Sequence, residues 1–149
     1  MPEYILDGEG SVSNARDRQL RSLFDTAATS TVSFNSTVQL TVRDTQVRVA
    51  WLGSDEFIPY YFCVAELCDV EFLVLNAEDD VKRAAFYPAR DNLIIFSSDD
   101  TIGAIELDRN GTQNFQPLYI GAEPDFAFDP SDESSVYIFD AGNLIRLFL

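Results

Sequence analysis

Polar and apolar residues alternate along most of this chain after residue 30. The alternation covers Val38–Val42 and resumes at Val47–Trp51, beyond a short polar turn. A period of two buries one face of an extended strand, so these two segments predict a β-hairpin. Further short apolar runs continue to residue 149, most of them bounded by Asp, Asn, Gly, Ser or Pro, which favour turns. The pattern therefore predicts an all-β domain.

Counted together, the runs give about twelve short antiparallel strands at roughly ten-residue spacing, which is typical of a propeller or a β-sandwich. The predicted strands are Thr31–Phe34, Val38–Val42, Val47–Trp51, Tyr60–Val64, Val70–Leu75, Ala84–Tyr87, Leu93–Phe96, Ile102–Leu107, Pro117–Ile120, Phe126–Phe128, Val136–Phe139 and Leu144–Leu149.

The first 30 residues follow a different pattern. Ser13 or Asn14 could cap a short helix through residues 15–24, in which Leu20, Leu23 and Phe24 share one face. One interpretation is an arm or helix that packs against its own domain, and the other is an arm that reaches a neighbouring subunit. We therefore divide the chain into an N-terminal arm, residues 1–30, and a single β domain, residues 31–149.

Two segments of the β domain resemble each other. Residues 85–88 read Ala-Phe-Tyr-Pro and residues 127–130 read Ala-Phe-Asp-Pro, 42 positions later. Each is followed by a polar turn, a strand that ends in Phe, an acidic or Gly-containing turn and another strand. The pattern resembles the blade repeat of β-propellers, although the Gly-His and Trp-Asp marks of the WD family are missing. Over residues 84–149, this resemblance implies blade-like sheets of four strands.

Twelve strands make roughly three blades, whereas closed propellers usually have four to eight. A partial propeller would expose strand edges, which invite pairing with another chain. The alternatives are association that completes the ring, a sandwich that satisfies its own edges, or a stack whose opening the N-terminal segment covers. The C-terminal strand ends in Leu147, Phe148 and Leu149, so we expect it to be buried or paired. It lies either in an assembly contact, together with Leu20, Leu23 and Phe24, or inside its own sheet.

The formal net charge is −15, and Lys82 is the only lysine. A nucleic-acid partner would require a cationic stripe, and an anionic membrane is disfavoured for the same reason. The apolar runs are too short to cross a bilayer, and the first residues do not form a secretory signal. We therefore expect protein partners, no nucleic acid and no membrane, and a cytoplasmic or virion location.

The residues needed for common catalysis are scarce. The chain has no histidine, which removes the usual general base and the usual zinc ligand. Cys63 and Cys68 cannot complete a zinc site by themselves. We expect two buried thiols, and the alternative is a disulfide across a tight hairpin if the chain reaches an oxidising setting. The acidic clusters are expected in turns. We accordingly assign no catalytic, cofactor-binding or metal-binding residue, expect no cofactor, and expect that the protein is not an enzyme.

The function expected from these features is structural. We expect an assembly subunit that acts through protein–protein contacts in a homo-oligomer or larger complex, by analogy with virion or phage tail components. The alternative is a binding module that presents loop ends to a carbohydrate or a basic protein. In that case Asp99 and Asp100 would hold the basic ligand. Trp51, Tyr60, Tyr61 and Tyr87 could line a binding face or fill the core.

Overall fold

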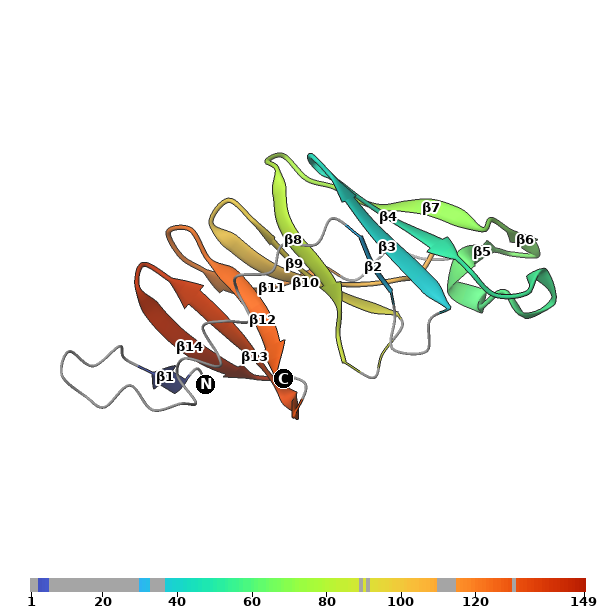
Figure 1. Ribbon diagram of the computed structural model, residues 1–149. Coiled ribbons are helices and arrows are strands. Elements are labelled where there is room, and N and C mark those ends of the chain that lie inside the picture. Colours follow the sequence, from blue (N-terminus) through green and yellow to red (C-terminus); the bar gives the residue numbers. More distant parts are fainter. Residues whose placement is uncertain are drawn as a thin grey trace.

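The computed structural model describes residues 3–5, 30–32, 37–88, 90, 92–109, 115–129 and 131–149. This part of the chain is all-β, as the alternation predicted, and its long strands form three antiparallel four-stranded sheets (Figure 1). The first sheet contains β2 (Ser30–Val32), β3 (Val38–Arg43), β4 (Gln46–Trp51) and β7 (Glu71–Asn76). The middle sheet contains β8 (Val81–Phe86), β9 (Leu93–Ser98), β10 (Thr101–Glu106) and β11 (Phe115–Ile120). The last sheet contains β12 (Asp125–Asp129), β13 (Asp132–Asp140), β14 (Asn143–Phe148) and β1 (Glu3–Ile5).

Eleven of the twelve predicted strands overlap one of these strands, and the prediction for Tyr60–Val64 is wrong in its first part. A 3-10 turn, η2 (Tyr60–Phe62), comes first and is followed by a two-residue strand, β5 (Cys63–Val64). Tyr61 and Phe62 are both buried, which a strand with one buried face does not allow. Pro59 starts the turn, and its carbonyl accepts a hydrogen bond from the Phe62 amide at 3.0 Å. The helix expected at residues 15–24 lies outside the described residues.

The three sheets repeat one hairpin geometry. The turn between the second and third strands begins with a residue of positive φ in each sheet: Asp44 at 52°, Asp99 at 44° and Ala141 at 50°. Asp99 and Ala141 are 42 positions apart, like the two similar sequence segments, whereas Asp44 and Asp99 are 55 positions apart. The first unit is longer because its third and fourth strands, β4 and β7, are joined by residues 52–70.

The connections between sheets repeat as well. The chain passes from the edge strand β7 to β8 through residues 77–80, and from the edge strand β11 to β12 through residues 121–124. The Ala77 amide donates to the Thr45 carbonyl at 2.8 Å, and the Gly121 amide donates to the Asp100 carbonyl at 2.8 Å. Thr45 and Asp100 are the second residues of equivalent turns, so each connection is held against the hairpin that precedes it.

Side chains of the middle sheet contribute to two separate cores. Ile94 and Phe96 on one face of β9 pack with Val49 and Phe72 of the first sheet. Ile95, which points to the opposite face, packs with residues of the last sheet that include Phe126, Ile138 and Ile145. The middle sheet therefore lies between the other two sheets and packs against each of them with a different face (Figure 1).

Asp140 joins the middle and last sheets. Its carboxylate accepts a 2.7 Å hydrogen bond from the Tyr119 hydroxyl and hydrogen bonds from the Ala122 and Glu123 amides. Gly121 lies so close to this carboxylate that a Cβ there would collide with it. Burial raises the pKa of Asp140, but the hydrogen bonds from Glu123, Tyr119 and Ala122 outweigh it and hold the pKa below its ordinary value.

The C-terminal strand β14 lies inside its sheet, between β13 and β1. Tyr4 is in register with Ile145, so the N-terminal strand completes the last sheet. The C-terminal strand is thus paired inside its own sheet, as one of the two alternatives had it, and an assembly contact at Leu147, Phe148 and Leu149 stays a prediction. β1 covers this edge of β14 over residues 144–146.

Candidate functional site: an apolar insertion in the first sheet

Of the assembly contacts expected from the sequence, Leu147, Phe148 and Leu149 lie in the described part of the chain. Leu20, Leu23 and Phe24 lie outside the described residues. Leu147 packs against the core between the middle and last sheets. Phe148 and Leu149 are half-exposed, and the Arg146 guanidinium lies 4.4 Å from the centre of the Phe148 ring.

Exposed apolar side chains gather instead in residues 52–70, which we call the insertion. It holds six of the eleven large hydrophobic side chains that are exposed in the described part of the chain. Leu67 and Phe57 are the most exposed, at 80% and 73%. The insertion projects beyond the ends of the first sheet, on the side of the molecule opposite to the two termini (Figure 1). The six are Leu52, Phe57, Tyr60, Val64, Leu67 and Val70.

The insertion is anchored by buried aromatic rings on its inner side. Phe62 is fully buried and meets the Phe72 ring edge-on, with centroids 5.1 Å apart. Trp51 lies 6.2 Å from Phe62 and donates from its indole nitrogen to the Ser54 carbonyl at 2.9 Å. Gly53 packs against the Trp51 ring, where any larger side chain would collide. Aromatic pairs of this kind contribute about 0.5–1.5 kcal/mol beyond their buried area.

Arg109 ties the insertion to the middle sheet. Its guanidinium donates to the Phe62 carbonyl at 3.0 Å and pairs with the Asp69 carboxylate at 2.8 Å. The same guanidinium lies 5.3 Å from the centre of the Phe72 ring. Arg109 therefore adds a second hydrogen bond to the Phe62 carbonyl, which already accepts one from the Asp69 amide at 3.1 Å.

A disulfide closes the outer hairpin of the insertion, contrary to the interpretation of two buried thiols. Cys63 and Cys68 face each other across β5 and β6 (Leu67–Cys68) and are bonded. Cys63 is buried, but Cys68 is exposed. Val64 pairs with Leu67 beside them, and Ala65 turns the chain at a φ of 54° that alanine seldom adopts. The cross-link holds this turn, since an alanine–glutamate pair does not favour it.

The charge of the insertion is entirely negative. It carries Asp55, Glu56, Glu66 and Asp69 and has no lysine or arginine. Asp69 is paired with Arg109. Asp55, Glu56 and Glu66 are exposed and form no ion pair with any described residue. The surface thus combines apolar side chains with unpaired carboxylates.

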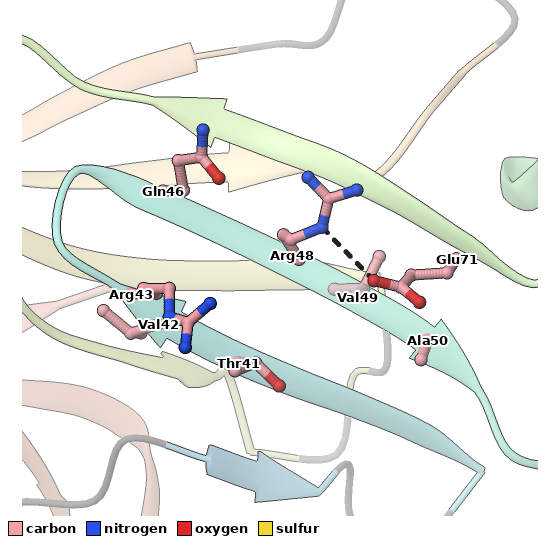
Figure 2. A pocket seen from close by; sticks show the side chains of 8 residues that line it. All are labelled: Thr41, Val42, Arg43, Gln46, Arg48, Val49, Ala50 and Glu71. Carbon is pink, nitrogen blue, oxygen red and sulfur yellow. Dashed lines mark hydrogen bonds and ion pairs between the residues drawn. The ribbon is translucent and has the colours of Figure 1, made fainter.

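A second surface feature is a polar hollow on the outer face of the first sheet, which Figure 2 shows from close by. Arg48 pairs with Glu71 across β4 and β7, with a 3.2 Å distance between the nitrogen and the oxygen. Thr41, Arg43 and Gln46 complete its polar lining. The lining has no aromatic side chain on which a sugar ring could stack. The Arg48 guanidinium is already paired with the Glu71 carboxylate.

The third surface feature is an acidic hollow that contains Asp99 and Asp100. It is formed where the β7–β8 and β9–β10 turns meet. Glu78 and Asp79 share its lining, together with the ring of Phe115. The Asp99 carbonyl accepts a hydrogen bond from the Lys82 ammonium at 3.2 Å. Asp99 and Asp100 form the β9–β10 turn and line this hollow. The described residues contain no group of three or more side chains suited to hold a metal ion.

Trp51, Tyr60, Tyr61 and Tyr87 were expected either to line a binding face or to fill the core, and the structure shows examples of both exposed and buried rings. Tyr61 fills the core, with 4% of its surface exposed, whereas its neighbour Tyr60 is 69% exposed on the insertion. Trp51 and Tyr87 are partly buried. The sequence signals for the insertion were the break in alternation at Pro59 and the closely spaced cysteines, but neither showed which side chains point outward.

Comparison with known proteins adds no assignment: no family model matches the chain, and a search of curated proteins found no match. No helix among the described residues is long and apolar enough to cross a lipid bilayer.

Proposed function

We propose that this protein is a structural or assembly subunit that acts by protein–protein contact, and that the insertion is its contact surface. The observation that carries the proposal is the concentration of exposed apolar side chains on residues 52–70. Apolar side chains held in water by a fixed framework favour association, because a partner removes their area from solvent. Phe62, Arg109 and the Cys63–Cys68 bond hold the framework in place.

Preorganisation supports the same proposal. A loop that becomes ordered only on binding loses conformational entropy at that moment, which weakens the complex. In the insertion, the Phe62 and Asp69 amides already donate hydrogen bonds to the Pro59 and Phe62 carbonyls. Exposed apolar residues on such a loop can contact a partner without a further ordering cost.

The edges of the sheets are less suited to this role. The edge strand β11 contains Pro117 and a register shift against β10, and β7 has a register shift against β4. Proline and bulges of this kind discourage edge-to-edge pairing. We therefore place the contact on the insertion and not on a strand edge.

We further infer that the three sheets are blades of a partial propeller. The repeated passage from the edge strand of one sheet to the first strand of the next supports this arrangement, and so does the shared turn geometry at Asp44, Asp99 and Ala141. In this arrangement β1 completes the last blade, and the insertion is an elaboration of the first blade between its third and fourth strands.

The test of the proposed function compares three serine substitutions of exposed leucine or isoleucine residues. Leu67→Ser changes the insertion, Ile120→Ser changes the edge of the middle sheet, and Leu149→Ser changes the C-terminus. Each tagged variant is purified from the native source, and the proteins that accompany it are quantified against those of the wild type. We expect the accompanying protein to fall about tenfold with Leu67→Ser and to stay with the other two.

Equal recovery in all three variants would contradict the proposal, and so would a loss limited to Ile120→Ser or Leu149→Ser. Circular dichroism and thermal midpoints of the three variants, measured first, ensure that each is folded. A loss with Leu149→Ser alone would place the contact at the C-terminal strand, as one of the sequence interpretations had it.

A further inference from the structure

We propose that the partner of the insertion is a protein with a basic rim around an apolar pocket. This inference rests on the proposed function and adds the chemistry of the partner. It begins from the alternation of acidic and apolar residues along the insertion: Glu56 precedes Phe57, and Glu66 precedes Leu67. Both carboxylates and both apolar side chains are exposed.

The carboxylates of the insertion are available for a partner. Asp69 is used internally, because Arg109 pairs with it at 2.8 Å. Asp55, Glu56 and Glu66 have no ion-pair partner among the described residues. A contact that covered them without supplying cations would bury unpaired charge, which is costly. Arginine or lysine at the rim of the partner would avoid that cost, and arginine is enriched in protein interfaces.

The same charges disfavour the other occupants of this surface. A second copy would bring a chain of net charge −15 and an identical acidic rim against the first, so like charges would face each other. The cytoplasmic face of a membrane carries anionic lipids and repels exposed carboxylates. A basic protein surface is attracted at long range by the net charge of −15. At contact it is attracted by the carboxylates of the insertion.

The experiment uses a fluorescent amphipathic helical peptide of leucine and lysine as the probe and measures its dissociation constant by anisotropy. Two double variants change the net charge equally: Glu56→Lys/Glu66→Lys in the insertion and Glu78→Lys/Asp80→Lys in the β7–β8 turn. We expect the first to raise the dissociation constant about tenfold and the second by less than about threefold. The double variant Phe57→Ser/Leu67→Ser does not change the net charge, and we expect it to raise the dissociation constant of the peptide about tenfold as well.

Several results would overturn the inference. Equal weakening by the two charge variants would mean that the peptide senses only the total charge. Equally tight binding of a leucine–glutamate peptide would mean that the insertion does not select cations. Concentration-dependent dimerisation that Leu67→Ser abolishes would assign the surface to a second copy, and binding of wild-type protein to phosphatidylcholine vesicles that the same change abolishes would assign it to a lipid.

The two proposals fail differently. In a first outcome, Leu67→Ser reduces the co-purifying protein while the double variants do not change the dissociation constant of the peptide as expected. In that case the insertion is still the contact surface, but the proposed preference for a basic partner is wrong. If Leu67→Ser releases nothing from the native source, the proposed function itself is wrong, whatever the peptide does. Circular dichroism of each variant is recorded first, so that loss of folding is not taken for loss of binding.

Discussion

The middle sheet and the insertion are both rich in large apolar side chains, yet they use them in opposite ways. Ile94, Ile95 and Phe96 of β9 are buried on both faces of the sheet, between two cores. Phe57 and Leu67 of the insertion stand in water. Rigidity in the middle sheet comes from burial, whereas in the insertion it comes from the Cys63–Cys68 bond and from side chains that anchor it underneath.

This difference separates stability from recognition. Substitutions in the middle sheet should lower the free energy of unfolding, because they leave cavities in close-packed layers. Substitutions of exposed side chains in the insertion should leave folding almost unchanged and alter binding only. The predictions that follow test this separation.

The largest effect is expected for Ile95→Ala, in the middle sheet. Ile95 is fully buried, and removing its side chain should lower the free energy of unfolding by about 2–4 kcal/mol. The measurement is urea denaturation at neutral pH. A loss below about 1 kcal/mol would mean that the middle and last sheets are not tightly packed against each other.

The next effect concerns the junction between the middle and last sheets. Asp140→Asn should lower the free energy of unfolding by about 1–3 kcal/mol at neutral pH, because a neutral amide cannot accept all the hydrogen bonds that the carboxylate accepts. The folded pKa of Asp140 lies below its ordinary value of 3.8. The carboxylate therefore stabilises the fold above that pH, and its contribution is lost as the pH falls through the folded pKa.

Denaturation of wild type and Asp140→Asn across this pH range measures the difference between them. The difference should shrink on acidification. Asp132 also has a lowered pKa, about 2, mainly through the hydrogen bond from the Ser134 side chain, but its titration affects both proteins and cancels. A difference that grows on acidification would contradict the assignment to Asp140.

A third prediction concerns the cross-link of the insertion. Loop-closure entropy assigns about 2 kcal/mol to a disulfide that closes so short a loop. Cys63→Ser/Cys68→Ser should therefore loosen the insertion while the three sheets stay folded. Limited proteolysis should show new cleavage within residues 52–70 and nowhere else. Cleavage that spreads into the first sheet would show that the insertion supports the fold.

The smallest effect is expected for Leu67→Ser, which should change the free energy of unfolding by less than about 0.5 kcal/mol, since exposed positions contribute little to stability. Ile120→Ser, at the exposed edge of the middle sheet, is its matched control. A loss above about 1 kcal/mol for Leu67→Ser alone would mean that the Leu67 side chain packs against the protein.

The strands could be predicted from the sequence because period-two alternation is a local signal. The failures have physical causes that are not local. Tyr60 and Tyr61 are adjacent and chemically identical, but only the tertiary contacts of η2 decide which one is buried. The pairing of β1 with β14 joins opposite ends of the chain, and no turn or periodicity marks it. The disulfide depends on the hairpin geometry that brings Cys63 opposite Cys68.

The candidate surface was missed for a related reason. Apolar residues indicate a core unless the structure shows that they point outward, and the sequence predicted Tyr60–Val64 as a strand with a buried face. Of the acidic clusters expected in turns, Asp99 and Asp100 form the β9–β10 turn, with Asp99 at a φ of 44°. The cluster from Asp129 to Glu133 differs, because Asp129 ends β12 and Asp132 and Glu133 begin β13.

Amide hydrogen exchange of the free protein, resolved by residue, tests most directly whether the insertion is a fixed surface. The amides of Leu52, Phe62 and Asp69 donate to the carbonyls of Thr37, Pro59 and Phe62. They should exchange about 100-fold more slowly than in an unstructured peptide, an opening free energy of about 3 kcal/mol. If all three exchange at the unstructured rate while the amides of β9 stay protected, the insertion is a mobile loop and does not present a preformed contact surface.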